Sequence, residues 1–277
     1  MTSAPPEVTE VLDFPAFDAE ARPFFEVDEA RCTIALTILA GARAGIHRDP
    51  RLYRVDRRTG PALYAMRTPP FPLVVARGDL EAAEALGRFV AASDPALPGV
   101  TGPTELARAA AAGTGRAVVK ETAMRLYICR AVTPPSRPAA GRARLAEARD
   151  LDRVAGFYGG FEKDAGVSLP PARETMSRAI DEARLFVWQD ASGEVVALTQ
   201  KTMATGRSTR VNLVYTPDAH RGRGYASSLV AHVTQTVLDR GDGAFAVLFT
   251  DLGNPTSNGI YQAIGYSPVS DFVELRF

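Results

Sequence analysis

A glycine-rich turn between a strand and a long helix restricts the fold of this chain more than any other feature. Residues 209–217, TRVNLVYTP, have the β-branched and aromatic content of a strand. Residues 224–241 carry apolar side chains at helical spacing. The turn between them, HRGRGYA at 220–226, contains Gly222 and Gly224, which allow positive φ and close approach of the backbone to a ligand. Because the first N–H groups of the helix point outward with the positive end of its dipole, the segment predicts a phosphate-binding site.

Two nucleotide-binding motifs have similar glycines, and this chain fits neither. A dinucleotide-binding fingerprint has a third glycine three residues after Gly224, where this chain has Ser227. A Walker A loop ends in Gly-Lys followed by Ser or Thr, and the turn has no such ending. The turn alone therefore leaves two interpretations, a phosphate-binding loop and a glycine-rich turn without a ligand.

A Pro-rich segment divides the chain into two halves. The run TPPSRPAAGR at 133–142 has three prolines and no apolar periodicity, which is typical of a linker. The predicted organisation is an acidic leader 1–30, an α+β domain 31–133, a linker 134–142 and a second domain 143–277.

Turn residues and apolar periodicity predict the elements of each half. In the first half we expect strands at 62–66, 73–76 and 124–132 and helices at 79–94 and 104–112, whereas 32–43 could be a helix or a buried strand. In the second half we expect a short strand leading to Asp150 as a helix cap, then helices at 151–158 and 172–183 and a hairpin over 184–205. The strand and the helix around the glycine-rich turn follow, and the helix has its C-cap at Gly241. We expect the chain to finish with a strand at 244–252, a helix at 254–265 and a last strand ending at Phe277.

Composition argues against several classes of partner. Lys plus Arg and Asp plus Glu each total 32, so the net charge is zero and we expect no nucleic-acid or anionic-membrane partner. The longest uncharged apolar stretch, 32–42, is too short to span a bilayer, and the first 30 residues have eight acids and one base, the reverse of a secretory signal. Cys32 and Cys129 have no second Cys or His at metal spacing. We therefore expect no metal site and two free buried thiols in a cytoplasmic protein.

The motifs after residue 211 occur in the order and spacing of a known superfamily. Arg221-x-x-Gly-x-Ala opens a helix, and the next strand is followed by Asn254-Pro-Thr-Ser-Asn and Tyr261-Gln-Ala-Ile-Gly-Tyr. This arrangement resembles the GNAT superfamily of acyl-CoA-dependent N-acyltransferases. The resemblance covers 143–277, with its specific motifs in 211–266. It implies an α/β (α+β) fold with a mixed, mostly antiparallel central sheet flanked by helices.

The first half has a similar alternation of elements but no counterpart of the phosphate-binding loop. PGVTGPTELA at 98–107 is at most a degenerate version of that loop. The whole chain therefore resembles a tandem arrangement in which a degenerate, ligand-free GNAT-like unit precedes the active one. An unrelated α+β domain is the alternative for the first half.

The resemblance also implies site residues in the second half. Acetyl-CoA or CoA is the implied cosubstrate, with its pyrophosphate on backbone N–H groups of the loop and its pantetheine arm along a strand that splays from its neighbour. The implied CoA-binding residues are Leu213, Val214, Tyr215, Thr216, Arg221, Gly222, Arg223, Gly224, Tyr225, Ala226, Asn254, Ser257 and Tyr261. Tyr261 matches the residue that protonates the CoA thiolate, and a phenol with a reference pKa near ~10 is protonated at neutral pH. Capping of the last helix is the alternative role of Asn254 and Ser257.

The acceptor side departs from the superfamily pattern. Some GNAT relatives carry a glutamate base early in the strand that here has Arg210 and Asn212, so the base lies elsewhere or is a water. Glu162 and Asp164 fall between two helices where the fold builds its acceptor pocket, although surface acids are the alternative reading of both. Together with Asn212 they are the candidate acceptor-side residues. The implied acceptor is a small-molecule or peptide amine that attacks directly in a ternary complex.

Two other functions stay open. The missing strand glutamate leaves room for a non-catalytic acyl-CoA-binding or sensing protein, whereas Tyr261 favours an N-acetyltransferase. Nucleic-acid binding by the Arg-Gly-Arg-Gly run at 221–224 is disfavoured by the zero net charge. The sequence does not identify the acceptor, the acyl chain length or the oligomeric state.

Overall fold

The computed structural model describes residues 5–47, 49–167 and 169–277, and the contacts within the chain divide it into two units. Unit 1 contains the residues up to 126 together with 249–254 and 268–277, and unit 2 contains 127–248 and 255–267. Each unit thus includes segments from both sides of the Pro-rich segment. The reason is strand pairing, because β12 (Ser267–Arg276), the last strand of the chain, pairs antiparallel with β5 (Gly99–Pro103) in unit 1.

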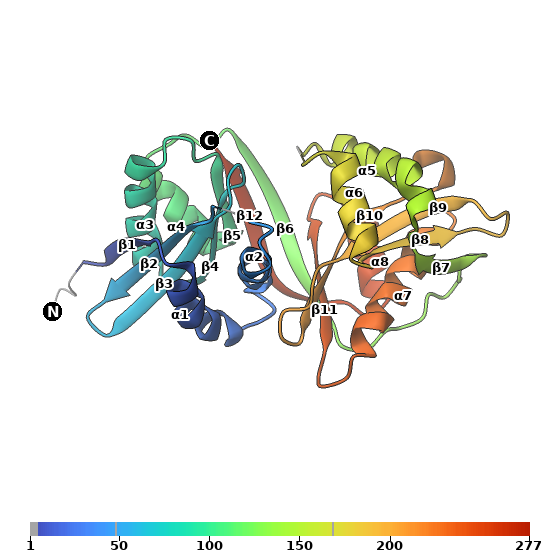
Figure 1. Cartoon of the computed structure of the whole chain (residues 1–277), viewed down its shortest axis with the longest axis horizontal. Helices are drawn as coiled ribbons and strands as arrows, with labels where there is room; N and C mark the ends of the chain where they lie inside the picture. The colour runs from blue at the N-terminus through green and yellow to red at the C-terminus, as the bar shows by residue number, and fades with distance from the viewer. Residues whose placement is uncertain (1–4, 48, 168) are drawn as a thin grey trace. The chain divides into compact units, whose positions relative to one another are not determined.

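Unit 1 is a sheet with helices on both faces (Figure 1). Its strand order is β1 (Glu7–Val11), β2 (Arg51–Arg57), β3 (Gly60–Arg67), β4 (Leu73–Gly78), β5, β12 and β6 (Lys120–Cys129). Helices α1 (Phe14–Glu26) and α2 (Thr33–Arg43) pack on one face, and α3 (Leu80–Ser93) and α4 (Thr104–Thr114) on the other. Strands β4 and β5 pair parallel, because α3 crosses over between them.

Residues 5–30, the described part of the acid-rich segment, belong to the fold of unit 1. They form β1 and α1, neither of which the sequence predicted. Asp13 caps α1, and Phe17 and Phe25 lie in the same hydrophobic cluster as α2. The ambiguous run at 32–43 forms the helix α2, whose buried side chains belong to that cluster as well.

Unit 2 repeats the layered arrangement. Its strand order is β6, β11 (Phe245–Asp251), β10 (Ser208–Tyr215), β9 (Val195–Lys201), β8 (Leu185–Gln189) and β7 (Arg142–Leu145). Helices α5 (Leu151–Ala165) and α6 (Ala172–Asp181) pack on one face, and α7 (Tyr225–Leu238) and α8 (Pro255–Ala263) on the other. Strands β10 and β11 pair parallel across the α7 crossover, whereas β7 to β10 pair antiparallel.

The predicted fold class is confirmed. Both units have a mixed, mostly antiparallel sheet, and each has one parallel pair bridged by a helix, β4–α3–β5 in unit 1 and β10–α7–β11 in unit 2. Some predicted boundaries are wrong. Helix α7 ends at Leu238 with Asp239 as its C-cap, because Gly241 lies in the following turn, and β6 covers Lys120–Cys129 rather than 124–132.

Asp150 occupies the predicted N-cap position of α5, but its side chain makes no capping hydrogen bond to that helix. Its two carboxylate oxygens accept hydrogen bonds from Arg144 at 2.6 and 2.9 Å, and one of them also accepts from the backbone N–H of Glu147 at 2.8 Å. Burial acts to raise the pKa of the carboxyl, but these hydrogen bonds outweigh it and hold the pKa below its usual value. A carboxylate with a depressed pKa stabilises the fold above pH ~4, and this contribution is lost as the pH falls through its folded pKa.

We expect Asp150→Asn to lower the free energy of unfolding by about 2–3 kcal/mol at pH 7, because Arg144 is left half-buried without its partner. Urea unfolding at pH 7 and pH 3 measures this, and the difference from the unsubstituted protein should shrink at pH 3. The matched control is Asp152→Asn, whose exposed ion pair with Arg173 should contribute less than about 1 kcal/mol. An equal loss in the free energy of unfolding for both variants would show that the buried Asp150 stabilises the fold no more than an exposed acid does.

Candidate functional site

The turn between β10 and α7 leaves the N-terminus of α7 open. Gly222 and Gly224 have φ values of 76° and 77°, in the left-handed region that favours glycine. Gly224 is the N-cap of α7, and as a glycine it has no side chain that could cap the first turn of the helix. A Cβ atom added at Gly222 would meet no other atom within 4 Å, so the turn has free space beside it. The unused N–H groups and the helix dipole together make a site for an anion.

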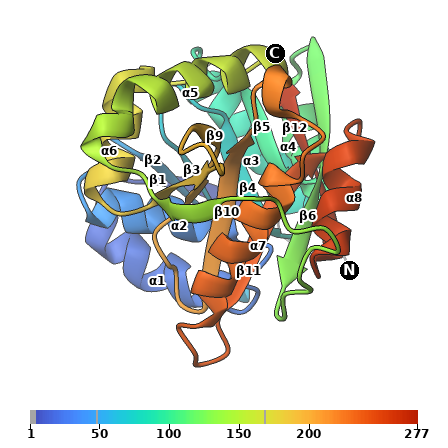
Figure 2. The ribbon, with the colours of Figure 1, turned by 90° about the vertical axis from the view of Figure 1, so that its right-hand side faces the viewer.

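Strand β10 (Figure 2) stops pairing with β11 before it reaches this turn, and its pairing with β9 is interrupted before it resumes at Tyr215. Among the described residues, its parallel pairs with β11 cover only Ser208 to Arg210. A bulge between Asn212 and Tyr215 interrupts its pairing with β9, and within the bulge Leu213 has a φ of 52°. A leucine in the left-handed region is strained by roughly 1–3 kcal/mol, which is typical of functional segments. No glycine or other turn residue marks the bulge, so the sequence does not predict it.

Three buried polar atoms around this segment have no hydrogen-bond partner. They are Asn212 Oδ1, Thr216 Oγ1 and His220 Nδ1, all on β10 or in the turn that follows it. Buried polar atoms are satisfied in the great majority of cases, so unsatisfied ones along one segment indicate a place where a polar ligand binds. The backbone of β10 that is not paired with β11 and the three polar atoms suit a ligand with amide groups. The open N-terminus of α7 suits a phosphate group on the same ligand.

Arg221 is engaged by the protein itself. It donates to Asp164 at 2.6 Å and to the carbonyl of Thr216 at 2.9 Å, and it forms an ion pair with Asp218 at 2.6 Å. The hydrogen bond with Asp164 raises the pKa of the Arg221 side chain. Its guanidinium therefore ties the end of α5 to the turn, and the backbone N–H groups are left as the main donors to an anion.

Tyr261 is buried on α8. Its ring lies edge-on to that of Tyr266 with centroids 6.1 Å apart, in a hydrophobic cluster that also contains Tyr225 at the start of α7. Burial raises the pKa of Tyr261 to about 12, and a hydrogen bond with the Ser257 side chain acts in the opposite direction. Val214 of β10 packs against the same cluster. Tyr261, Ser257, Tyr225 and β10 are thus brought to one region of unit 2.

Other predicted site residues have structural partners. Glu162 accepts a hydrogen bond from the backbone N–H of Leu169 at 2.9 Å and so holds the loop after α5. The Tyr215 ring lies near that of Phe157 on α5, with centroids 6.1 Å apart. Ala226 lies in the first turn of α7, and Arg223 donates to the carbonyl of Ala219 at 3.4 Å. Asn254 groups with unit 1, where its backbone N–H donates to Asp251 at 3.0 Å.

In unit 1 the helix that corresponds to α7 is α3, and the N-terminus of α3 is capped by a side chain. The Asp79 carboxylate caps α3 by accepting from the Ala82 N–H at 2.7 Å, and Arg57 donates to both of its oxygens. An internal anion thus takes the place that the turn in unit 2 leaves open. The proposed degenerate loop at 98–107 is wrongly placed, because that segment forms β5 and the start of α4, whereas the equivalent connection is at residues 78–80.

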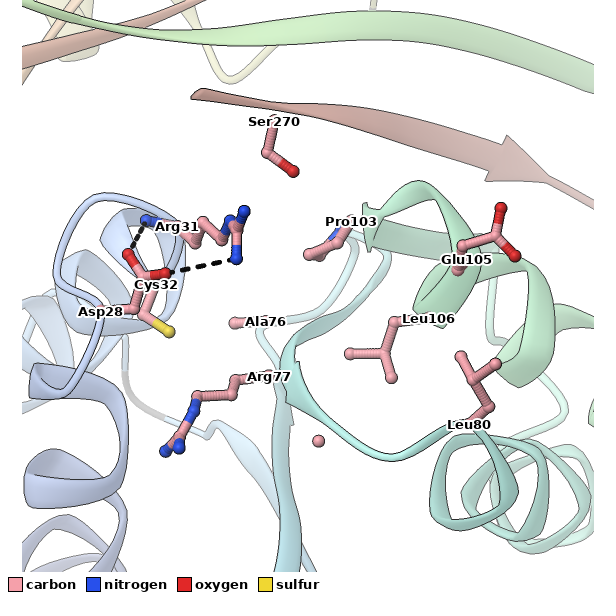
Figure 3. Close-up of a pocket in the computed structure, with 11 residues that line it drawn as sticks. Asp28, Arg31, Cys32, Ala76, Arg77, Leu80, Pro103, Glu105, Leu106 and Ser270 are labelled. Atoms are coloured by element: carbon pink, nitrogen blue, oxygen red, sulfur yellow. Dashed lines mark hydrogen bonds and ion pairs between the residues drawn. The ribbon is translucent and has the colours of Figure 1, made fainter. Parts of the chain in front are cut away.

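A cavity of about 380 Å³ lies beyond the paired part of β4 and β5 in unit 1 (Figure 3). The pairs end at Val74–Thr101, and the lining residues Ala76 to Gly78 and Pro103 follow on the two strands. Arg31 extends toward Pro103 and is paired with Asp28 at 3.6 Å. In both units the described pairing of the two parallel strands ends partway along them, but the helix N-terminus beside them differs.

Cys32 and Cys129 are both buried and free. Burial raises the pKa of Cys32 to about 12, so it is an unreactive thiol at neutral pH. In the described part of the chain, no group of three or more His, Cys, Asp or Glu side chains could hold a metal ion. None of the described helices is both long and apolar enough to cross a membrane.

Comparisons with known proteins agree with this architecture. Residues 191–274 match the family model described as FR47-like protein, and none of the curated proteins compared with the chain matches it. A GCN5-related N-acetyltransferase from Sphaerobacter thermophilus is 17% identical, with a TM-score of 0.62 over 100% of this chain and 96% of that chain. One from Kribbella flavida is 22% identical, with a TM-score of 0.56 over 88% and 95%.

A tandem GNAT protein from the clavulanic acid biosynthesis pathway covers the chain in the same way. It is 12% identical, with a TM-score of 0.57 over 98% of this chain and 97% of that chain. At these identities the likeness concerns the fold. The GNAT resemblance is confirmed at that level, and similarity to GNAT structures extends over both units.

Proposed function

We propose that this protein is a GNAT-type N-acetyltransferase that moves an acetyl group from acetyl-CoA to a primary amine at unit 2. The observation that carries this proposal is the uncapped N-terminus of α7 beside the unpaired segment of β10. The turn at 221–226 supplies backbone N–H donors for the pyrophosphate, and residues 213–216 supply peptide groups for the amides of the pantetheine arm. The buried free thiols suit a reducing compartment, so we place the protein in the cytoplasm.

The proposed reaction is direct attack within a ternary complex. The nitrogen of the neutral amine attacks the thioester carbonyl carbon, a C–N bond forms, the C–S bond breaks and the sulfur leaves as a thiolate. The nitrogen loses one N–H proton as the amide forms, which balances the proton that the thiolate takes up. Tyr261 is the proposed proton donor, since a pKa of about 12 keeps its phenol protonated at neutral pH. A thiolate next to this buried phenol is desolvated too, which raises the pKa of the thiol and brings the two groups closer in acidity.

The amine must lose a proton before it attacks, and no carboxylate stands free for this on the predicted acceptor side. Glu162 holds the backbone of Leu169, and Asp164 is paired with Arg221. Strand β10 presents Arg210 and Asn212 instead of an acid. We propose that a water bound to backbone carbonyls of the bulged strand accepts the proton. The role of Asn254 as a donor to the pantetheine or adenosine end stays a prediction.

Release of free thiol tests this function. We expect the protein to release CoA thiol when it is mixed with acetyl-CoA and a panel of primary amines, and to do so only when an amine is present. The same protein should bind CoA in calorimetry. CoA binding without thiol release for any amine would instead support the second candidate, an acyl-CoA-binding or sensing protein, which the absence of an acid on β10 favours.

A further inference from the structure

Arg210 lies on the face of the unit 2 sheet that carries α5 and α6. The two residues flanking it face α7: Thr209 accepts a hydrogen bond from Arg240, which follows α7, and Val211 packs in the cluster of α7. Because successive side chains of a strand point to opposite faces, Arg210 points away from α7. It is also the last residue of β10 that pairs with β11. Its side chain therefore starts at the point where the two parallel strands separate.

The guanidinium of Arg210 has no counter-ion within the described chain. None of the described acidic side chains forms an ion pair or a hydrogen bond with it, although its backbone N–H donates to Thr202 Oγ1 at 3.1 Å. Other arginines of unit 2 are paired, Arg144 with Asp150 and Arg153 with Glu194. Arg210 is only half-exposed, and burial lowers its pKa to about 10, which leaves it cationic at neutral pH. An unpaired cation in such a place is costly unless a ligand brings the anion.

Asn212 supplies the second observation. It lies two residues after Arg210 on the same face, about 7 Å along the strand, and its Oδ1 atom is buried without a hydrogen-bond partner. A side-chain amide oxygen accepts hydrogen bonds and suits the N–H groups of an amine. The strand thus presents a donor for an anion and an acceptor for an amine at neighbouring positions of one face.

We infer that the acceptor is an amine that also carries a carboxylate, with the carboxylate on Arg210 and the amine nitrogen near Asn212 Oδ1. The planar guanidinium binds a carboxylate through two parallel hydrogen bonds, which also orients the amine toward the thioester. This inference rests on the proposed acetyl transfer for its role in the reaction. The recognition of the carboxylate itself does not depend on turnover.

The test compares matched amines with and without the negative charge. Glycine, β-alanine and L-phenylalanine are each compared with their carboxamides, as acceptors in the thiol-release assay and as ligands of the CoA-loaded protein in calorimetry. Because a carboxamide changes the pKa of the neighbouring amine, the preference is read as a ratio between the unsubstituted protein and Arg210→Gln. We expect at least one carboxylate to be preferred, and Arg210→Gln to reduce that preference about tenfold or more in both kcat/KM and affinity.

Three controls make the result specific. Arg210→Lys keeps the charge and should retain part of the preference, whereas Arg178→Gln, which removes an exposed arginine of α6, should leave it unchanged. The affinity of Arg210→Gln for CoA should equal that of the unsubstituted protein, which shows that unit 2 is folded. A protein that binds carboxylates no better than carboxamides, or an equal preference in Arg210→Gln, would overturn the inference. Carboxylate binding that depends on Arg210 without any turnover would instead refute acetyl transfer and leave the anion site standing.

Discussion

Tyr261→Phe is expected to lower kcat at least tenfold while the Kd for CoA changes little. The lost hydroxyl acts when negative charge develops on sulfur, so it matters in the transition state and hardly at all in the bound ground state. Proton delivery of this kind contributes typically ~10²–10⁴-fold, and water can replace part of it. Phenylalanine keeps the ring and its edge-on contact with Tyr266. Steady-state kinetics with a known acceptor, together with calorimetry for CoA, measures both quantities.

The control for Tyr261 is its neighbour Tyr266. The Tyr266 hydroxyl is buried as well, but it is hydrogen-bonded to Thr234 at 2.7 Å, on the α7 side of the cluster. Tyr266→Phe should therefore lower stability by about 1 kcal/mol and leave kcat nearly unchanged. Since a pKa of about 12 keeps Tyr261 protonated, the rate of the unsubstituted protein should not fall between pH 7 and pH 10 through loss of this proton. Equal kcat values for both tyrosine variants would make Tyr261 a packing residue.

Gly222→Pro is expected to weaken CoA binding by about a hundredfold or more. Proline holds φ near −65°, whereas Gly222 has a φ of 76°, so the turn must change shape, and one N–H donor is lost. The changed turn would lose two or three hydrogen bonds to the charged pyrophosphate, and each contributes about 1.5–3 kcal/mol to CoA binding. Arg221→Ala should cost less than tenfold, because its side chain is bound to Asp164 and Asp218.

Comparing Gly222→Ala with Gly241→Ala separates an effect on the CoA site from the general effect of backbone strain on stability. Both glycines have left-handed φ values, 76° and 73°, and a Cβ at either position meets nothing within 4 Å. They lie at opposite ends of α7, so both alanine variants should be similarly strained, but only Gly222→Ala should affect CoA binding. Calorimetry and urea unfolding on the two proteins check this. A larger loss of affinity for Arg221→Ala than for Gly222→Pro would mean that side chains, and not the backbone, hold the phosphate.

Local signals predicted much of unit 2. Gly222 and Gly224 marked the turn because only glycine adopts its backbone angles cheaply, and the apolar spacing of α7 identified the helix that follows. The strand–helix–strand order around the turn is the order that a parallel pair such as β10–β11 requires. Each of these features is encoded by neighbouring residues, which is why a single sequence shows them.

Features that depend on distant partners were missed. The bulge at Leu213 arises from the pairing of β10 with β9, and nothing in the run VNLVY distinguishes it from a regular strand. Pairing of β12 with β5 joins segments about 170 residues apart, so no local pattern predicts it. Helix α1 was not predicted, because its segment was interpreted as an acidic leader. Its buried side chains Phe17, Ala21 and Phe25 nevertheless have helical spacing.

The acceptor side was predicted least well. Glu162 and Asp164 were expected between two helices but lie in the last turns of α5. Their partners, the N–H of Leu169 and the Arg221 guanidinium, are fixed by the packing of distant segments. The sequence marked Arg210 only as a departure from a pattern. The proposed role of Arg210 in binding a carboxylate rests on the face of β10 on which it lies and on the lack of a described acid paired with it.

A crystal structure of the full chain with acetyl-CoA bound tests the central claim most directly. The account predicts the pyrophosphate within hydrogen-bonding distance of the backbone N–H groups at 221–226 and the pantetheine arm beside residues 213–216 of β10. It also predicts the thioester sulfur near the Tyr261 hydroxyl. Density for the pyrophosphate at the Asp79-capped end of α3 in unit 1, with the turn of unit 2 empty, would contradict it.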